Sequence, residues 1–337
     1  MLRTALCHQL GIAYPIFSVG MGPVAGLELT AAVSNAGGCG VLGGVLKPPP
    51  YLQQEIRQLR TLTEQPFAVN IILALLEDGQ IEACLAERVP LLVLFWGDPK
   101  PYVAEAHRRG TKVFIQVGSV EEATAAAEAG VDGIIAQGVE AGGHVRGVTS
   151  LSTLVPAVVN AVNPVPVIAA GGIATGRGVV AALSLGAQAV SMGTRFLCST
   201  EANAAQAYKE LVVRSTAEDT VYTLLFDVGW PDAAHRVLRN TECAEWEAAG
   251  RPATGQRPGE GTIIGTVSLA GTTREVPKYS ALMPLASFSG DIEYGVLYAG
   301  ESCRLVHDIQ PAAQIVRDLV REAEEVIEHL HRGEQQS

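Results

Sequence analysis

Short apolar runs alternate with longer amphipathic stretches eight times within about the first 215 residues, and this alternation constrains the fold more than any other feature. The apolar runs predict strands at 15–20, 39–44, 67–73, 91–96, 112–118, 133–138, 165–172 and 189–196. The stretches between and after them predict helices at 26–38, 48–63, 77–88, 101–110, 119–130, 151–162, 175–186 and 200–215. The runs are apolar on both faces, as parallel strands are when helices cover them. Eight such units predict an α/β fold, the TIM (β/α)8 barrel.

An open, doubly wound sheet is the competing architecture. A sheet of that kind more often has about five to seven strands and an early GxGxxG loop for a dinucleotide. That motif is absent from this chain, so we expect the closed barrel.

The alternation ends near residue 216, which divides the chain into three predicted parts. Residues 1–215 are expected to form the barrel. Residues 216–295 mix aromatics, a short helical stretch and a Pro/Gly-rich loop, and we expect a cap over the active site. Residues 296–337 are expected to pack back on the barrel and to close with a long amphipathic helix at 311–332.

Composition narrows the class of protein. The formal net charge of -11 argues against nucleic-acid or anionic-membrane partners. No apolar run approaches the roughly 20 residues needed to cross a bilayer, and the N-terminus lacks the apolar core of a signal peptide. Six scattered cysteines without a CxxC motif predict reduced thiols. We expect a cytoplasmic enzyme acting on a small molecule; a homo-oligomer is compatible with the sequence, which does not set the oligomeric state.

In a TIM barrel the active groups lie at the C-terminal ends of the strands. Most of those ends carry glycines or neutral amides, and the candidate binding residues are Gly20, Met21, Gly22, Asn70, Gln116, Gln137, Gly142 and Gly143. Glycines allow the backbone to approach a flat, polar ligand closely. Because no clustered His/Asp/Glu set is present, no metal is expected.

Glycine pairs and their neighbours follow the seventh and eighth predicted strands, where barrels commonly bind phosphate. The candidates are Gly171, Gly172, Gly193 and Thr194, with Arg195 as a possible helper or a partner of a strand neighbour. A single pair would be explained by a simple strand-to-helix turn. Two pairs in the two expected loops favour phosphate.

His144 is the candidate catalytic residue. It follows two glycines after the sixth predicted strand, and imidazole is suited to proton transfer near neutral pH. Glu140 either orients this histidine or caps a nearby loop, and the sequence leaves both open.

Several motifs together make the chain resemble the nitronate monooxygenase family of FMN-dependent TIM barrels. They cover nearly the whole chain: PIFSVGMG at 15–22, AVSNAGGCGVLGG at 32–44, FAVNI at 67–71, QGVEAGGHVRG at 137–147, PVIAAGGIATGRG at 166–178, GAQAVSMGTRFLCSTEA at 186–202 and YAGES at 298–302. The resemblance implies FMN, with the residues from Gly20 to Gly143 listed above along the flavin and the four residues after strands seven and eight on its phosphate. It also makes His144 the active-site histidine.

The resemblance implies oxidation of alkyl nitronates by O2 to a carbonyl compound and nitrite. The chain departs from the best-known members, because it reads GMGPVAG after the first strand and GGHVRG around His144. The alternative is therefore an NAD(P)H-dependent reductase of quinones or of enoyl-acyl carrier protein, with NAD(P)H as co-substrate. A module that only binds FMN is a third reading. The roles of Lys278 and Tyr298 stay open, and for Trp96 and Trp230 core packing is the simpler expectation.

Overall fold

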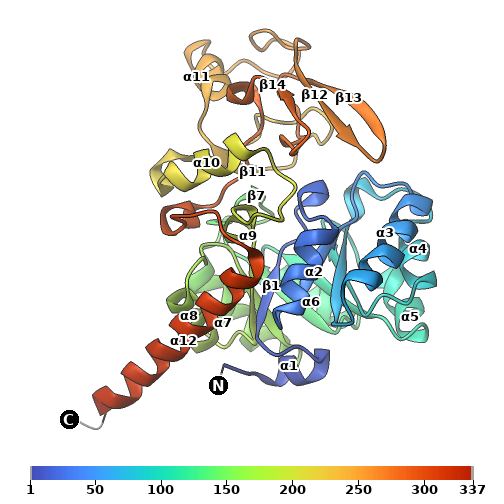
Figure 1. Cartoon of the computed structure of the whole chain (residues 1–337), viewed down its shortest axis with the longest axis vertical. Helices are drawn as coiled ribbons and strands as arrows, with labels where there is room; N and C mark the ends of the chain where they lie inside the picture. Colours follow the sequence, from blue (N-terminus) through green and yellow to red (C-terminus); the bar gives the residue numbers. More distant parts are fainter. Residues whose placement is uncertain (1, 335–337) are drawn as a thin grey trace.

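The computed structural model describes residues 2–334, in which the eight predicted runs form one parallel sheet (Figure 1). Its strands are β1 (Ile16–Ser18), β2 (Gly40–Gly43), β3 (Phe67–Ile72), β4 (Leu91–Phe95), β5 (Lys112–Val117), β6 (Gly133–Gln137), β8 (Val167–Ala170) and β9 (Ala189–Met192). The strand order is β1-β9-β8-β6-β5-β4-β3-β2. A parallel bridge between Phe17 and Cys39 joins the two end strands, so the sheet closes into the predicted TIM barrel.

Helices surround the barrel, and one position in the ring differs from the prediction. The first seven helices of the ring are α2 (Leu27–Asn35), α3 (Pro49–Leu62), α4 (Gln80–Ala86), α5 (Lys100–Arg108), α6 (Val120–Glu128), α7 (Leu151–Val162) and α8 (Gly176–Ser184). The helix predicted at 200–215 exists as α10 (Gln206–Arg214) but lies above the ring (Figure 1). The C-terminal helix α12 (Ala312–Glu334) packs between α8 and α2 and completes the ring instead.

The barrel interior is filled with apolar side chains and closed at its N-terminal end. Phe17, Phe114 and Ile135 belong to an interior cluster with exposures of 2% or less. The short helix α1 (Ala5–Leu10) adds Leu6 and Cys7 to the same cluster. Because α1 plugs one end of the barrel, a ligand can enter only from the other end, where the strands have their C-termini.

The eighth predicted strand is shorter than its sequence suggested. β9 ends at Met192, and residues 194–196, predicted as strand, lie in the short helix α9 (Thr194–Leu197). This turn directs Arg195 away from the barrel mouth, and its guanidinium pairs with the Asp308 carboxylate at 2.7 Å. Arg195 therefore ties the C-terminal segment to the barrel.

Residues after 216 form two small antiparallel sheets above the mouth (Figure 1). One has the order β10-β11-β7, from β10 (Thr220–Thr223), β11 (His235–Leu238) and β7 (Gly143–His144). The other has the order β13-β12-β14, from β12 (Ile263–Leu269), β13 (Thr272–Pro277) and β14 (Ser289–Gly290). The remaining helices are α11 (Thr241–Ala248), η1 (Gly22–Val24), η2 (Leu73–Leu75), η3 (Ala217–Asp219), η4 (Ile292–Tyr294) and η5 (Glu301–Leu305). Since β7 comes from the loop that carries His144, the first sheet joins this upper part to the candidate site.

Candidate active site

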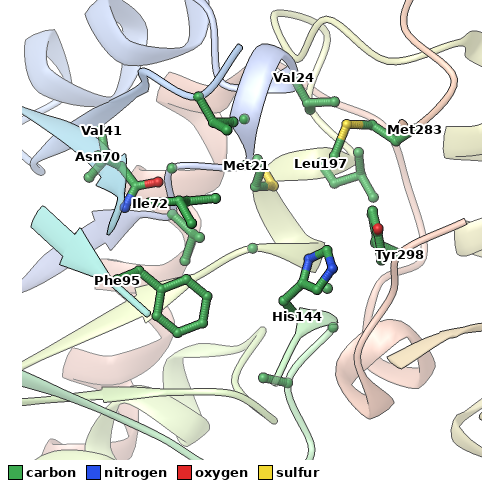
Figure 2. Close-up of a pocket in the computed structure, with 18 of the residues that line it drawn as sticks. Met21, Val24, Val41, Asn70, Ile72, Phe95, His144, Leu197, Met283 and Tyr298 are labelled. Atoms are coloured by element: carbon green, nitrogen blue, oxygen red, sulfur yellow. The ribbon is translucent and has the colours of Figure 1, made fainter. Parts of the chain in front are cut away.

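A cavity of about 430 Å³ lies at the C-terminal ends of the strands. Every residue predicted from the sequence to form the site lines it: Gly20, Met21, Gly22, Asn70, Gln116, Gln137, Gly142, Gly143, His144, Gly171, Gly172, Gly193 and Thr194. Figure 2 shows the His144 ring pointing into this space, with Asn70, Ile72 and Phe95 across from it. The closed barrel therefore brings together residues that are 174 positions apart in the chain, as 194 − 20 = 174.

One end of the cavity offers unused backbone donors. No hydrogen bond among residues 2–334 engages the backbone N–H of Gly172, Gly193 or Thr194. A Cβ atom added at Gly193 would find its nearest neighbour at 3.9 Å, so this backbone faces open space. The Thr194 hydroxyl accepts from the backbone N–H of Gly300 at 3.0 Å, which leaves its own proton to donate. Together these groups can hold an anion without a cationic side chain.

The side-chain amides of Asn70, Gln116 and Gln137 differ in the hydrogen bonds that they make within the protein. Asn70 donates from Nδ2 to the carbonyl of Val93 at 2.9 Å and keeps its side-chain oxygen for a ligand. Gln116 has no side-chain hydrogen bond within the described residues, so its whole amide is available at the cavity wall. Gln137 lines the cavity, but both ends of its amide are bound to the backbone of the next loop. Gln137 therefore positions that loop and is less suited than Asn70 or Gln116 to contact a ligand directly.

The loop after β6 is held by these two Gln137 contacts. Its Nε2 donates to the His144 carbonyl at 2.9 Å, and its Oε1 accepts from the backbone N–H of Arg146 at 3.1 Å. Gly143, with φ of 77°, supplies the left-handed backbone turn immediately before His144. The loop is thus fixed on both sides of the histidine, and the imidazole is aimed by the backbone.

The His144 ring lies in apolar and aromatic surroundings. It stacks on Trp230 with ring centroids 3.9 Å apart, and its Nε2 is closed off from solvent without a hydrogen-bond partner in the described chain. Burial, with a smaller contribution from His235, lowers the pKa of His144 to about 3. The imidazole is therefore neutral at physiological pH. A neutral ring can donate one N–H and accept through its other nitrogen.

His235 is a neighbour of His144 in the folded chain. Antiparallel pairing of β11 with β7 sets it directly opposite His144, with ring centroids 5.4 Å apart. Its Nε2 accepts from the backbone N–H of Phe226 at 3.2 Å, so its Nδ1 carries the proton and donates to the Ala233 carbonyl at 2.8 Å. Burial lowers the pKa of His235 as well. His235 is a neutral, fully buried wall of the site.

Three residues left open by the sequence now have observed contacts. Tyr298 lines the cavity 5.3 Å from the His144 ring, but its hydroxyl donates to the Ala281 carbonyl at 3.0 Å. Lys278 does not line the cavity and pairs with Glu245 at 2.7 Å. Glu140 accepts from the backbone N–H of Leu151, with both carboxylate oxygens at 3.0 Å, at the start of α7. Glu140 is thus the loop cap.

Trp230 packs in the core, as expected from the sequence, and has a second place in the site. It is buried, as core packing predicts, but it also lines the cavity and covers one face of the His144 ring. Trp96 meets His144 edge-on at 6.2 Å and lies under the Arg146 guanidinium. The aromatic wall around His144 therefore comes from both the barrel and the segment after residue 216.

The described residues offer neither a metal site nor a membrane-spanning helix. No group of three or more His, Cys, Asp or Glu side chains in that part of the chain is arranged to hold a metal ion. Within the same residues, no helix combines the length and apolarity needed to cross a bilayer.

The mouth of this TIM barrel holds an anion cradle and a neutral histidine, and comparison with known proteins indicates the class of enzyme. The family model described as nitronate monooxygenase matches residues 3–82 and 76–322. The chain belongs to the nitronate monooxygenase family, and it is an oxidoreductase.

Its relatives carry different names. The (3aS,4S,5R,7aS)-5-hydroxy-7a-methyl-1-oxo-octahydro-1H-indene-4-carboxyl-CoA dehydrogenase of Mycobacterium tuberculosis is 31% identical, covering 98% of this chain and 97% of its own. A probable nitronate monooxygenase of Staphylococcus saprophyticus is 32% identical, with coverage of 97% and 99%. The solved structure of FabK from Thermotoga maritima is 34% identical with a TM-score of 0.81, covering 98% and 99%. The family is therefore shared by enzymes of different named activities.

Proposed function

We propose that this protein is an FMN-dependent oxidoreductase that uses NAD(P)H to reduce an uncharged, conjugated carbonyl compound, with acyl thioesters as the favoured substrate class. FMN fits the residues present. The free backbone N–H groups of Gly172, Gly193 and Thr194 suit its phosphate, and the open amides of Asn70 and Gln116 suit its polar ring edge. When bound, FMN supplies the hydride-transfer chemistry that no side chain of the chain can provide.

The substrate proposal rests on the neutral His144 in an apolar wall. Trp230 and Tyr298 line the cavity beside it, and no cationic side chain of the described chain hydrogen-bonds to its ring. Such surroundings favour an uncharged reacting group, because burying an unpaired charge is costly. A neutral imidazole N–H can hydrogen-bond to a carbonyl oxygen and polarise it. Neutral histidines polarise substrate carbonyls in this way in other enzymes.

In this mechanism the residues of the chain orient, polarise and exclude water. Gln137 holds the loop so that His144 donates to the substrate carbonyl. Trp230 and His235 fix the ring plane and keep the imidazole uncharged. We further propose that residues 216–295 act as the cap of the site, because Trp230 and Met283 line the cavity from that segment.

Oxidation of alkyl nitronates is the second candidate, and the family match favours it. The free-base form of His144 has a nitrogen lone pair that can accept a proton from the carbon of a neutral nitroalkane. The unfavourable feature is charge, since a nitronate anion would enter a site whose histidine is neutral. The same cavity and the same FMN residues serve both reactions.

Anaerobic stopped-flow spectroscopy of the purified FMN holoenzyme separates the two. The protein is mixed in turn with NADH, NADPH and propyl-2-nitronate while flavin absorbance is followed. Bleaching by a nicotinamide within seconds, followed by reoxidation with an enoyl thioester or a quinone, supports the reductase. Bleaching by the nitronate with both nicotinamides inert would refute it in favour of nitronate oxidation.

A further inference from the structure

Arg274 is the single arginine or lysine among the residues that line the cavity, and the described chain gives it no ion-pair or hydrogen-bond partner. It belongs to β13, in the hairpin that β12 and β13 form beside the barrel mouth (Figure 1). Glu275 is the one acidic residue among those that line the cavity, so the charge of this unpaired arginine is open to a ligand.

The hairpin fixes where this arginine lies. Arg274 pairs directly with Val267 and lies two residues before Val276, so all three share one face of the hairpin. Val267 and Val276 are 1% and 2% exposed and belong to the main core cluster. Arg274 is the charged residue at the outer end of this core-facing side. Its backbone is therefore held by packing, while its exposed side chain reaches the cavity entrance.

The surrounding charges leave the guanidinium available. Most other arginines near the upper part are already paired, as Arg257 is with Asp227 and Arg236 is with Glu301. Glu275 also borders the cavity, but it projects from the opposite face of β13 and makes no ion pair with Arg274. The chain as a whole has a net charge of -11, so a free arginine at the entrance is a positive charge on a largely acidic protein. Its charge favours an anionic ligand there.

We propose that Arg274 binds a phosphate monoester on the tail of a substrate or co-substrate whose reacting end lies at His144. This rests on the proposed reductase function, because a nitronate has no such tail. Guanidinium binds phosphate through two parallel N–H donors. Two sources carry this chemistry: the 3′-phosphate of a coenzyme A thioester and the 2′-phosphate of NADPH.

Two matched ligand pairs test the proposal on the oxidised FMN holoenzyme. CoA is compared with 3′-dephospho-CoA, and NADP+ with NAD+, by calorimetric or flavin-difference titration. We expect the phosphorylated member of one pair to bind about 10-fold more tightly, as one charge-assisted pair contributes. The pair that shows this preference identifies the source of the phosphate.

Variants connect the preference to the residue. Arg274→Ala should bring the ratio within that pair close to one and leave the affinity for the dephosphorylated member unchanged. Arg274→Lys should keep part of the preference, and Arg304→Ala, an exposed arginine away from the cavity, should keep all of it. Glu275→Gln should tighten the phosphorylated member by about 2-fold, since it removes a nearby negative charge.

Two results would overturn the proposal. One is wild-type protein that binds both members of each pair within 2-fold, which needs no variant to fold. The other is an unchanged ratio in Arg274→Ala with normal FMN content. Failure here is distinct from failure of the proposed function, because flavin bleaching by NADH or NADPH is measured separately and does not require a phosphate preference.

Discussion

Gly193→Ala is the sharpest test of the anion cradle, because the structure separates its effect on folding from its effect on the ligand. Gly193 has φ of -95° and ψ of -69°, a conformation that alanine adopts readily. A methyl group there would have its nearest protein neighbours at 3.9 Å. The apo protein should therefore fold normally, with a stability equal to the wild type or about 0.4–1 kcal/mol higher.

Because Gly193 lines the cavity beside the free N–H groups of Gly193 and Thr194, we expect the same methyl group to crowd an anion bound there. A hydrogen bond from a neutral donor to a charged acceptor contributes about 1.5–3 kcal/mol. Loss of one such bond to the FMN phosphate predicts an affinity roughly 10- to 100-fold weaker. Titration of apo protein with FMN, followed by quenching of flavin fluorescence, measures this directly.

Gly26→Ala is the matched control. Gly26 also has a compatible backbone, with φ of -85°, and its added Cβ would lie 3.6 Å from the Glu28 carboxylate, outside the cavity. FMN affinity should not change in this variant. If Gly193→Ala binds FMN as tightly as wild type, the phosphate does not lie in this cradle and the assignment of the site is wrong.

Four further predictions concern the substrate end. Burial lowers the pKa of His144 to about 3, so its ring should not titrate between pH 5 and 8. The pH profile of kcat/KM should therefore show no acid limb from this residue. An acid limb near 6.5 that disappears in His144→Ala would contradict this. The same shift makes unfolded protein bind more protons than folded protein, so denaturant titrations should show His144 lowering stability as pH falls from about 6.5 towards 3. The Tyr298 hydroxyl is bound to the Ala281 carbonyl, so Tyr298→Phe should change kcat less than about 3-fold. It should lower the free energy of unfolding by about 1 kcal/mol, measured by thermal or urea unfolding. A kcat loss above 10-fold would give the hydroxyl a direct role. Gln137→Leu should lower kcat about 10-fold or more with little loss of FMN affinity, because it frees the backbone on both sides of His144. An equal loss of FMN affinity would instead mean that the amide contacts the ligand.

The barrel was predictable from the sequence because its periodic signals are local. Each apolar run and each helical stretch is read within about ten residues, and strand-end glycines indicate the mouth of the barrel. The position that a helix takes in the ring around the barrel could not be predicted in this way. The stretches at 200–215 and 311–332 are both amphipathic, and periodicity alone does not tell which one packs against α8 and α2. Tertiary packing gave this place to α12.

The features of the site that the sequence did not reveal have the same origin. Arg195 follows Gly193 and Thr194 in sequence, but one short helical turn directs it to Asp308. His235 is 91 residues from His144, as 235 − 144 = 91, and only the pairing of β11 with β7 makes them neighbours. Arg274 resembles any exposed arginine until its place on the core-facing side of β13 is known. Contacts that depend on strand register between distant segments have no local signal.

The lining of the cavity comes from two different parts of the chain. The anion cradle and the open amides belong to the barrel, whereas Trp230, Arg274 and Met283 come from the segment after residue 216. The two parts meet at His144, whose short strand pairs with β11. Under the proposed function, we expect changes in that segment to alter the substrate while the residues assigned to FMN and the histidine stay in place. Whole-chain identities of 31% to a CoA dehydrogenase and 32% to a probable nitronate monooxygenase do not discriminate between these activities, so the side chains facing His144 from the later segment are the ones to compare.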